Sequence, residues 1–196
     1  GTGHQAEHQA HWAAHTLGTD QVFIWGRDLV KASLLAAKLG RHGLAAHAVA
    51  TVQDVFEHCN VVITCTPSTQ AIVPVSVVKP GTHIVAMGAD SLGKQELDPH
   101  ILALARVIMT DDHRQCAERG ELAPALRAGL IANTADISLG QVLAGNIQGR
   151  ISPDDVTVAD LTGLAAQDIA IATLAVGLIQ ARVPADASNT LTSHTD

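Results

Sequence analysis

Short apolar runs alternate with helical stretches along most of this chain of 196 residues. Runs such as VVITC at 61–65 and HIVAM at 83–87 have the length and composition of strands that are covered on both faces. Strands that alternate with helices are joined by right-handed crossovers and form a mostly parallel sheet. The sequence therefore predicts an α/β fold, with helices packed on the faces of a parallel sheet.

The expected elements follow one another in a regular order. Strands are predicted at 22–25, 46–50, 61–65, 83–87, 106–110 and 156–161. Helices are predicted up to Leu17, from Asp28 to Arg41, from Thr51 to His58, after Asp98-Pro99, and at 165–182. Short helices and loops are expected at 115–149. We expect residues 1–183 to form one domain and the polar tail 184–196 to be disordered.

Charge and cysteine content exclude several classes of protein. The net charge is −7, and the 12 Lys and Arg residues are scattered, which argues against a nucleic-acid surface. Three cysteines without metal-type spacing are typical of reduced thiols in a cytoplasmic protein. The apolar stretch at 169–179 is too short to span a membrane. We therefore expect a cytoplasmic protein that binds neither nucleic acid nor a membrane.

The first six residues, GTGHQA, have the Gly-x-Gly-x-x-Ala spacing of a dinucleotide-binding turn. The first glycine allows a tight turn, the second lets the backbone approach a pyrophosphate, and the alanine lets the helix pack closely on the sheet. The N–H groups of the helix N-terminus then face the phosphates. We expect cofactor contacts from every residue of this turn, namely Gly1, Thr2, Gly3, His4, Gln5 and Ala6.

Such a turn normally follows a buried strand at the centre of the sheet, and no strand precedes it here. Without that strand the sheet would be split, and backbone groups on the neighbouring strands would lack partners. We therefore expect a doubly wound, mostly parallel Rossmann sheet that lacks its first strand upstream of Gly1. We also expect the chain to be a fragment of a longer protein.

The residues after the strand at 22–25 bear on the choice of cofactor. This position, about 20 residues after the glycine turn, is where an acidic residue binds the ribose in NAD-preferring sites. Here the sequence reads Gly26, Arg27, Asp28. Arg27 can pair with a 2′-phosphate and stack on the adenine, which favours NADP over NAD. In the alternative interpretation, Asp28 reaches the ribose and Arg27 is only solvated.

Five segments, in order, resemble the ornithine cyclodeaminase/mu-crystallin family. They are GTGHQA, TCTPST at 64–69, GADSLGKQELDP at 88–99, ERGEL at 118–122 and DLTGLAAQD at 160–168. The third is the most specific, and the resemblance extends from residue 1 to about residue 182. It implies a Rossmann domain that binds NAD or NADP, a small amino acid or imine as substrate, and a homodimer. The family also has a dimerisation domain, built mainly from its N-terminal part, and we expect this domain to be absent from the chain.

The resemblance also implies roles for single residues. Asp90 matches the acidic residue near the substrate amine, and would be the catalytic group that handles proton transfer. Lys94 matches a lysine on the cofactor side of the same loop. Further cofactor contacts are expected after the strands, from Thr66, Pro67, Ser68, Met87, Gly88, Leu161 and Thr162. From the residues alone, Asp90 can also be a turn cap and Lys94 a surface residue.

The leading interpretation is an NAD(P)-dependent oxidoreductase that acts on the C–N bond of an amino acid or its imine. Ketimine or pyrroline-2-carboxylate reductases and alanine dehydrogenase are the types implied by the family. One alternative is an ornithine or lysine cyclodeaminase, in which the hydride is taken up and returned. Another is a binding protein like mu-crystallin, which uses NADPH without catalysis.

Two polar groups receive no catalytic role. His4, His8, His11 and His15 share one helical face, nearly opposite the apolar stripe of Ala6, Ala10, Ala13 and Leu17, and no metal site is assigned to them. The second group, Asp111 to His113, is expected to form a solvated loop after a strand.

Overall fold

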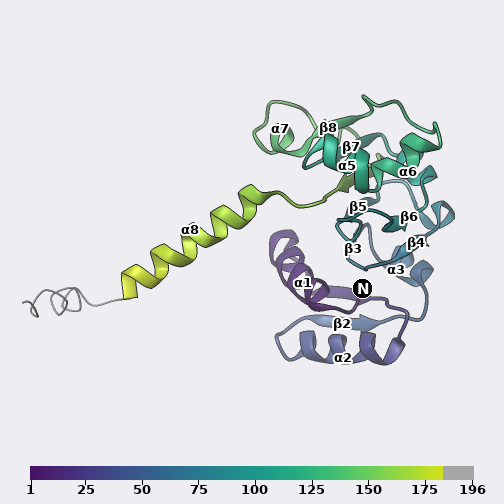
Figure 1. Ribbon diagram of the computed structural model, residues 1–196. Coiled ribbons are helices and arrows are strands. Elements are labelled where there is room, and N and C mark those ends of the chain that lie inside the picture. Colours follow the sequence, from purple (N-terminus) through teal and green to yellow (C-terminus); the bar gives the residue numbers. More distant parts are fainter. Residues whose placement is uncertain (183–196) are drawn as a thin grey trace, which may run out of the picture. The chain divides into compact units, whose positions relative to one another are not determined.

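All strand pairs in the computed structural model, which describes residues 1–182, are parallel. The strands are β1 (Gln21–Ile24), β2 (Ala45–Ala48), β3 (Val61–Thr64), β4 (Thr69–Val73), β5 (His83–Ala86), β6 (Gln95–Leu97), β7 (Val107–Thr110), β8 (Asp136–Ser138) and β9 (Thr157–Asp160) (Figure 1). The helices are α1 (His4–Leu17), α2 (Leu29–Gly40), α3 (Val52–His58), α4 (His100–Leu104), α5 (His113–Arg119), α6 (Leu122–Arg127), α7 (Leu139–Leu143) and α8 (Ala165–Arg182), with a short 3-10 turn η1 (Val75–Val77). The α/β fold with a parallel sheet is confirmed.

Side-chain caps explain where two of the predicted helices begin. Asp28 Oδ1 accepts hydrogen bonds from the N–H groups of Val30 and Lys31, at 2.9 and 3.2 Å, and so caps α2. Thr51 and Asp54 form a reciprocal capping box at the start of α3. Each cap satisfies N–H groups that have no partner within the helix.

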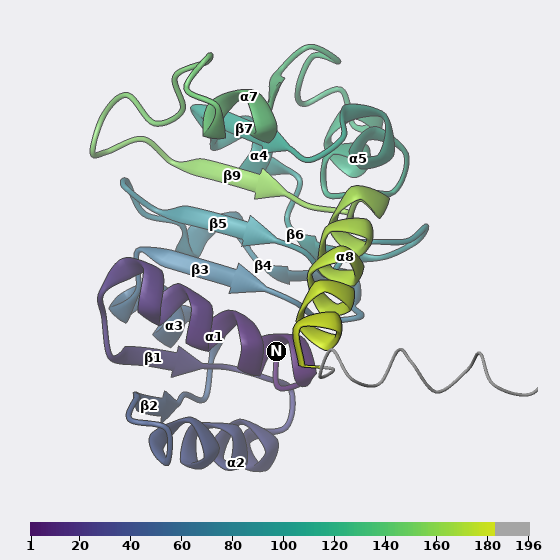
Figure 2. The same cartoon turned by 90° about the vertical axis from the view of Figure 1, so that its left-hand side faces the viewer.

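The strands belong to three sheets, and the largest has the order β3-β5-β9-β7-β8. Strands β1 and β2 form a separate pair, and β4 pairs with β6. The predicted split of the sheet is therefore present, and it lies between β1 and β3. Figure 2 shows β1 and β3 running in the same direction, with α1 lying across the space between them.

The register of the large sheet brings four strand ends together. Thr64 pairs with Ala86, Ala86 with Asp160, and Thr110 with Asp160. The residues that follow β3, β5, β9 and β7 therefore emerge side by side at one edge of the sheet. The strands are held there by a core in which Ile84 and Val158 are fully buried. This is the edge at which ligands bind in open parallel sheets.

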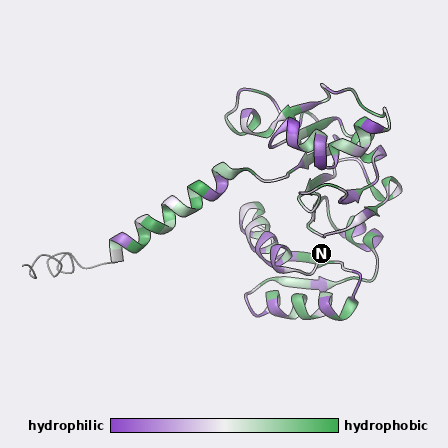
Figure 3. Cartoon of the chain, viewed as in Figure 1, coloured by the Kyte–Doolittle hydropathy of each residue, from purple (hydrophilic) through white to green (hydrophobic). Residues whose placement is uncertain are grey.

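The described residues form two compact units, Gly1–Thr162 and the part that begins at Gly163 and contains α8. Hydrophobic residues follow one another along much of α8 (Figure 3). Within residues 1–182, however, no helix combines the length and the apolar character that a membrane span requires. The expectation that residues 184–196 are disordered lies outside the described residues.

Candidate functional site

The glycine turn lies against the tip of β1. The Gly1 nitrogen donates to the carbonyl oxygen of Trp25 at 2.7 Å. A Cβ atom at Gly26 would lie 2.6 Å from Thr2 Cγ2, so the close contact between turn and strand tip requires a glycine there. Gly3 forms the N-cap of α1 without a side-chain hydrogen bond, and a Cβ atom on it would meet nothing within 4 Å. The N-terminus of α1 is therefore accessible to an anionic group.

The other residues of the turn face different neighbours. Ala6 packs on the apolar cluster beneath α2, as expected for close packing of the first helix. The His4 and His8 rings contact each other through their Nε2 atoms, at 3.0 Å, on the exposed face of α1. Gln5 is exposed. Within residues 1–182, no group of three or more His, Cys, Asp or Glu side chains is arranged to hold a metal ion.

Arg27 and Asp28 lie at the exposed tip of β1. Asp28 is engaged as the N-cap of α2, whereas Arg27 is exposed, and the neighbouring Gly26 lies against Thr2 of the glycine turn. The two segments that the sequence assigns to phosphate and ribose binding are thus adjacent.

The loops after β3 and β5 are joined by one buried carboxylate. Glu96 on β6 is fully buried, and its side chain accepts hydrogen bonds from Thr66 N at 2.6 Å and Gly88 N at 2.9 Å. A Cβ atom at Gly88 would lie 2.3 Å from the carbonyl oxygen of Thr66, so the two loops meet backbone to backbone. Glu96 therefore fixes two of the predicted cofactor-binding segments, and the sequence analysis did not single it out.

The remaining residues of these two loops are held locally. Ser68 N donates to Thr66 Oγ1 at 3.4 Å, and Ser68 Oγ donates to the carbonyl oxygen of Gln70 at 2.6 Å. Pro67 lies between them and is exposed. Met87 N donates to the carbonyl oxygen of Thr64 at 3.0 Å, which extends the pairing of β3 and β5 by one residue.

Two further buried acids, Glu121 and Asp160, also accept hydrogen bonds from main-chain amides. The carboxylate of Glu121 accepts from Glu96 N at 2.6 Å and Leu97 N at 3.1 Å, and Asp160 Oδ2 accepts from Leu122 N at 2.9 Å. Burial raises the pKa of Glu121 to about 8 and that of Asp160 to about 6, against the opposing effect of these backbone donors. Protons are therefore bound more tightly by these carboxyl groups in the folded state.

The pKa of Glu121 predicts that stability falls as the pH rises. Between the ordinary value of 4.5 and about 8, the folded state retains a proton that the unfolded chain has lost, so each step up in pH favours unfolding. The contribution of Glu121 to the free energy of unfolding should fall by on the order of 4 kcal/mol across this range. Urea denaturation at pH 5, 6.5 and 8 measures it. Glu121→Gln should make the free energy of unfolding less dependent on pH, whereas Glu118→Gln, at an exposed position, should leave its pH dependence unchanged. If the free energy of unfolding changed equally with pH in the original protein and both variants, the raised pKa would not belong to Glu121.

Asp90 and Lys94 meet in the loop after β5. Asp90 Oδ1 accepts hydrogen bonds from Lys94 Nζ at 2.6 Å and from Ser91 Oγ at 2.9 Å, and the Asp90 side chain is 51% exposed. The Lys94 ammonium holds the pKa of Asp90 below its ordinary value. Asp90 is thus a solvent-accessible, ionised carboxylate at neutral pH, next to the strand end to which the sequence analysis assigned it.

Leu161 and Thr162 follow β9 at the same edge. Leu161 N donates to the carbonyl oxygen of Ala86 at 2.8 Å. Thr162 donates from its N to Asp111 Oδ2 at 3.0 Å and from its Oγ1 to Asp111 Oδ1 at 3.3 Å. Asp111 follows β7, so it ties the ends of two neighbouring strands together.

The expected solvated loop at Asp111 to His113 is therefore wrong. Besides the contacts of Asp111, Asp112 accepts from Gln115 N at 2.8 Å and caps α5. His113 Nδ1 lies 2.8 Å from Asp136 Oδ1. All three side chains have structural partners. Those of Asp111 and His113 lie 51 and 23 residues away in the sequence, so the local pattern does not indicate them.

Comparisons with known proteins agree with this geometry. The chain is 38% identical to the iminosuccinate reductase of Paracoccus denitrificans (strain Pd 1222) over 178 residues, which cover 91% of the chain and 55% of that protein. The solved structure of that reductase in complex with NAD+ superposes with a TM-score of 0.83 at 37% identity, over 92% of the chain and 55% of the reductase. An archaeal alanine dehydrogenase dimer with bound NAD gives a TM-score of 0.82 at 34% identity, over 88% of the chain and 53% of that protein.

The chain thus spans about half the length of the relatives that it matches. The sequence model of the ornithine cyclodeaminase/mu-crystallin family matches residues 1–181, which is nearly all of the chain. The chain therefore belongs to the ornithine cyclodeaminase/mu-crystallin family.

Proposed function

We propose that the chain is the cofactor-binding domain of an NAD(P)-dependent oxidoreductase that acts on the C–N bond of an amino acid or its imine. The observation that carries the proposal is the convergence of the glycine turn, the two loops bonded to Glu96, and the Asp90–Lys94 pair at the carboxyl ends of neighbouring strands. Bound NAD(P) would supply hydride exchange at the substrate α-carbon. The open N-terminus of α1 at Gly3 suits its pyrophosphate.

Within this function, Asp90 handles the charge and the proton of the substrate nitrogen. An ionised, half-exposed carboxylate can hold a substrate ammonium group and accept a proton from it or from attacking water. Lys94 lowers the pKa of Asp90 further and fixes the direction of its Oδ1 atom. The walls of the cofactor site at the strand ends are then formed by Thr66, Gly88, Leu161 and Thr162.

Arg27 favours NADP as the cofactor. It is exposed at the tip of β1, while the neighbouring acid, Asp28, is occupied as a helix cap. Arg27→Ala should raise the KM for NADPH about tenfold or more and leave the KM for NADH within about twofold, because only NADPH carries the 2′-phosphate. Steady-state kinetics with both cofactors measures this. Equal effects on both would instead support NAD, which is the cofactor bound in the two structural relatives described above.

A cyclodeaminase is the second candidate, since a relative from Sinorhizobium fredii (strain NBRC 101917 / NGR234) with 40% identity carries that name without a characterised activity. The deciding experiment gives the protein L-ornithine with a catalytic amount of NAD+ and, separately, pyrroline-2-carboxylate with NADPH or NADH. Proline in excess of the NAD+ supplied, without net NADH, would identify a cyclodeaminase. Consumption of NAD(P)H with the cyclic imine would identify a reductase. Activity with neither, nor with alanine or pyruvate and ammonia, would contradict the proposal.

The assembly and location follow from the same proposal. A homodimer is supported by the archaeal alanine dehydrogenase, which was solved as a dimer. A cytoplasmic location is supported by the three cysteines, Cys59, Cys65 and Cys116, which are all free thiols.

A further inference from the structure

Two of the histidines on the polar face of α1 are in direct contact. His4 and His8 are one helical turn apart, and their Nε2 atoms lie 3.0 Å from each other. Both residues are exposed, so the pair is accessible to solvent. The rings of His11 and His15 on the same face instead lie edge to face against rings of other residues.

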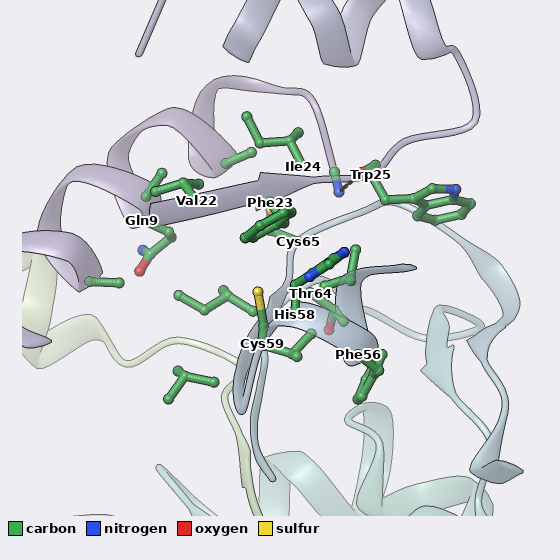
Figure 4. A pocket seen from close by; sticks show the side chains of 18 of the residues that line it. Gln9, Val22, Phe23, Ile24, Trp25, Phe56, His58, Cys59, Thr64 and Cys65 are labelled. Atoms are coloured by element: carbon green, nitrogen blue, oxygen red, sulfur yellow. Dashed lines mark hydrogen bonds between the residues drawn. The ribbon is translucent and has the colours of Figure 1, made fainter. Parts of the chain in front are cut away.

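The opposite face of α1 packs towards the protein and holds the helix in place. It borders a cavity of about 470 Å³ between β1 and β3 (Figure 4). The residues that α1 contributes to the lining of this cavity are Ala6, Gln9, Ala10, Ala13, Ala14 and Leu17. The histidine pair therefore lies outside the cavity, on a helix whose other side is fixed by packing.

The separation of the two Nε2 atoms suits two ligands of one metal ion. Zinc–imidazole bonds of about 2.0–2.1 Å, at angles of about 90–110°, place the two nitrogen atoms about 2.9–3.4 Å apart. In the neutral, metal-free pair, one Nε2–H group donates to the unprotonated Nε2 of the other ring. A cation can replace that proton when the donating ring changes tautomer and carries its proton on Nδ1. The rings are thus already placed as a metal would hold them.

The ligand set indicates the class of metal. Imidazole nitrogen favours cations such as Zn²⁺, Ni²⁺ and Cu²⁺, whereas Mg²⁺ and Ca²⁺ prefer oxygen. Glu7 is the nearest acid along the helix, and it is ion-paired with Lys38 at 2.7 Å. In the described part of the chain no third His, Cys, Asp or Glu side chain joins the pair. The remaining coordination positions are therefore left to water or to an oxygen atom of an anion.

The pair lies at the end of α1 that faces the glycine turn. His4 is the first residue of the helix and follows Gly3, where the free N–H groups are accessible to an anionic group. A dication bound to the pair would add positive charge at this end, where the proposed function places the pyrophosphate of NAD(P). A phosphate oxygen could also fill one of the open coordination positions.

We propose that His4 and His8 form a binding site for one divalent transition-metal cation of the zinc class, and that the bound cation strengthens the binding of the dinucleotide. The metal site depends only on the two imidazole rings. The effect on the dinucleotide rests on the proposed function, so the two parts are tested separately.

The first experiment titrates the chain 1–196 with Zn²⁺ alone, followed by calorimetry. His4→Gln and His8→Gln should each raise the Kd for Zn²⁺ about tenfold or more, because each removes one of two ligands. His15→Gln is the matched control, since it replaces another exposed histidine of the same helix, and it should leave the Kd within about twofold. An excess of Mg²⁺ should not displace the zinc. Circular dichroism checks that every variant is folded.

A second readout identifies the ligand atoms. The electron paramagnetic resonance spectrum of bound Cu²⁺ should show coupling to two imidazole nitrogens in the original protein, and to one fewer in His4→Gln or His8→Gln. Unchanged zinc affinity in the variant that lacks both His4 and His8 would overturn the metal site. Loss of binding in His15→Gln would overturn it as well, because the metal would then be held elsewhere on the helix.

The second experiment measures the Kd of NADH by fluorescence, with and without saturating Zn²⁺. Zinc should lower this Kd about fivefold or more in the original protein and leave it unchanged in the variant that lacks both histidines. Equal effects of zinc on both proteins would overturn the coupling. If the original protein bound zinc but bound NADH neither with nor without it, the proposed function would be wrong while the metal site would stand.

Discussion

Replacing Asp90 with asparagine is expected to lower kcat by roughly 10²–10⁴-fold, the usual contribution of a positioned acid or base. Asparagine keeps an oxygen for the hydrogen bonds from Lys94 and Ser91, so the loop should remain in place. It cannot accept the proton or hold the ammonium group of the substrate. The Kd of NAD(P)H, measured by fluorescence titration, should therefore stay within about twofold of the original value, and only turnover should change.

Asp154→Asn is the matched control for this experiment. Asp154 is exposed and precedes β9, so it lies at the opposite edge of the sheet from Asp90. Its replacement should change neither kcat nor cofactor affinity. If Asp90→Asn retained full turnover, Asp90 would be a turn residue and the proposed proton transfer would have to be assigned to another group.

Replacing Glu96 with alanine should have the largest effect on the fold of the site. Two buried N–H groups, of Thr66 and Gly88, would lose their acceptor, and each such loss costs about 1–3 kcal/mol. The free energy of unfolding should fall by about 2–6 kcal/mol, as measured by urea denaturation. Because the same bonds fix the loops after β3 and β5, the Kd of NAD(P)H should rise about tenfold or more.

Glu96→Gln is a milder test of the same two hydrogen bonds. It retains one acceptor oxygen and the shape of the side chain, so its effects on stability and on Kd should be intermediate. Glu118→Ala, at an exposed position on α5, should alter neither quantity. Unchanged cofactor affinity in a folded Glu96→Ala protein would mean that the two loops do not bind the cofactor.

The strands that build the sheet could be predicted because their runs are apolar on both faces. β3, β5, β7 and β9 are of this kind, and the split between β1 and β3 followed from the position of the glycine turn. β4, β6 and β8 were not predicted. They contain three to five residues, and their polar side chains, as in Gln-Glu-Leu and Asp-Ile-Ser, interrupt the apolar pattern from which a buried strand is predicted.

The supporting acids of the site could not be predicted from local pattern. Glu96 lies in a polar segment between Lys94 and Asp98, and an acid in such a position is normally solvated. Its partners, Thr66 N and Gly88 N, become neighbours only when β3 and β5 pair in register. Asp90 and Lys94 could be assigned because the family resemblance implies roles for these two positions of the motif GADSLGKQELDP, whereas Glu96, in the same motif, was given none.

The hydrogen bonds from main-chain amides to Glu96 bear on how enzymes of this kind acquire different substrate specificities. Because the carboxylate binds N–H groups that every residue except proline possesses, the positions of the loops do not depend on which side chain Thr66 carries. Gly88 is the exception, since any larger residue would collide with the carbonyl oxygen of Thr66. Side chains at the carboxyl ends of these strands can therefore be exchanged during evolution, and new specificities acquired, while the backbone of the loops bonded to Glu96 stays the same.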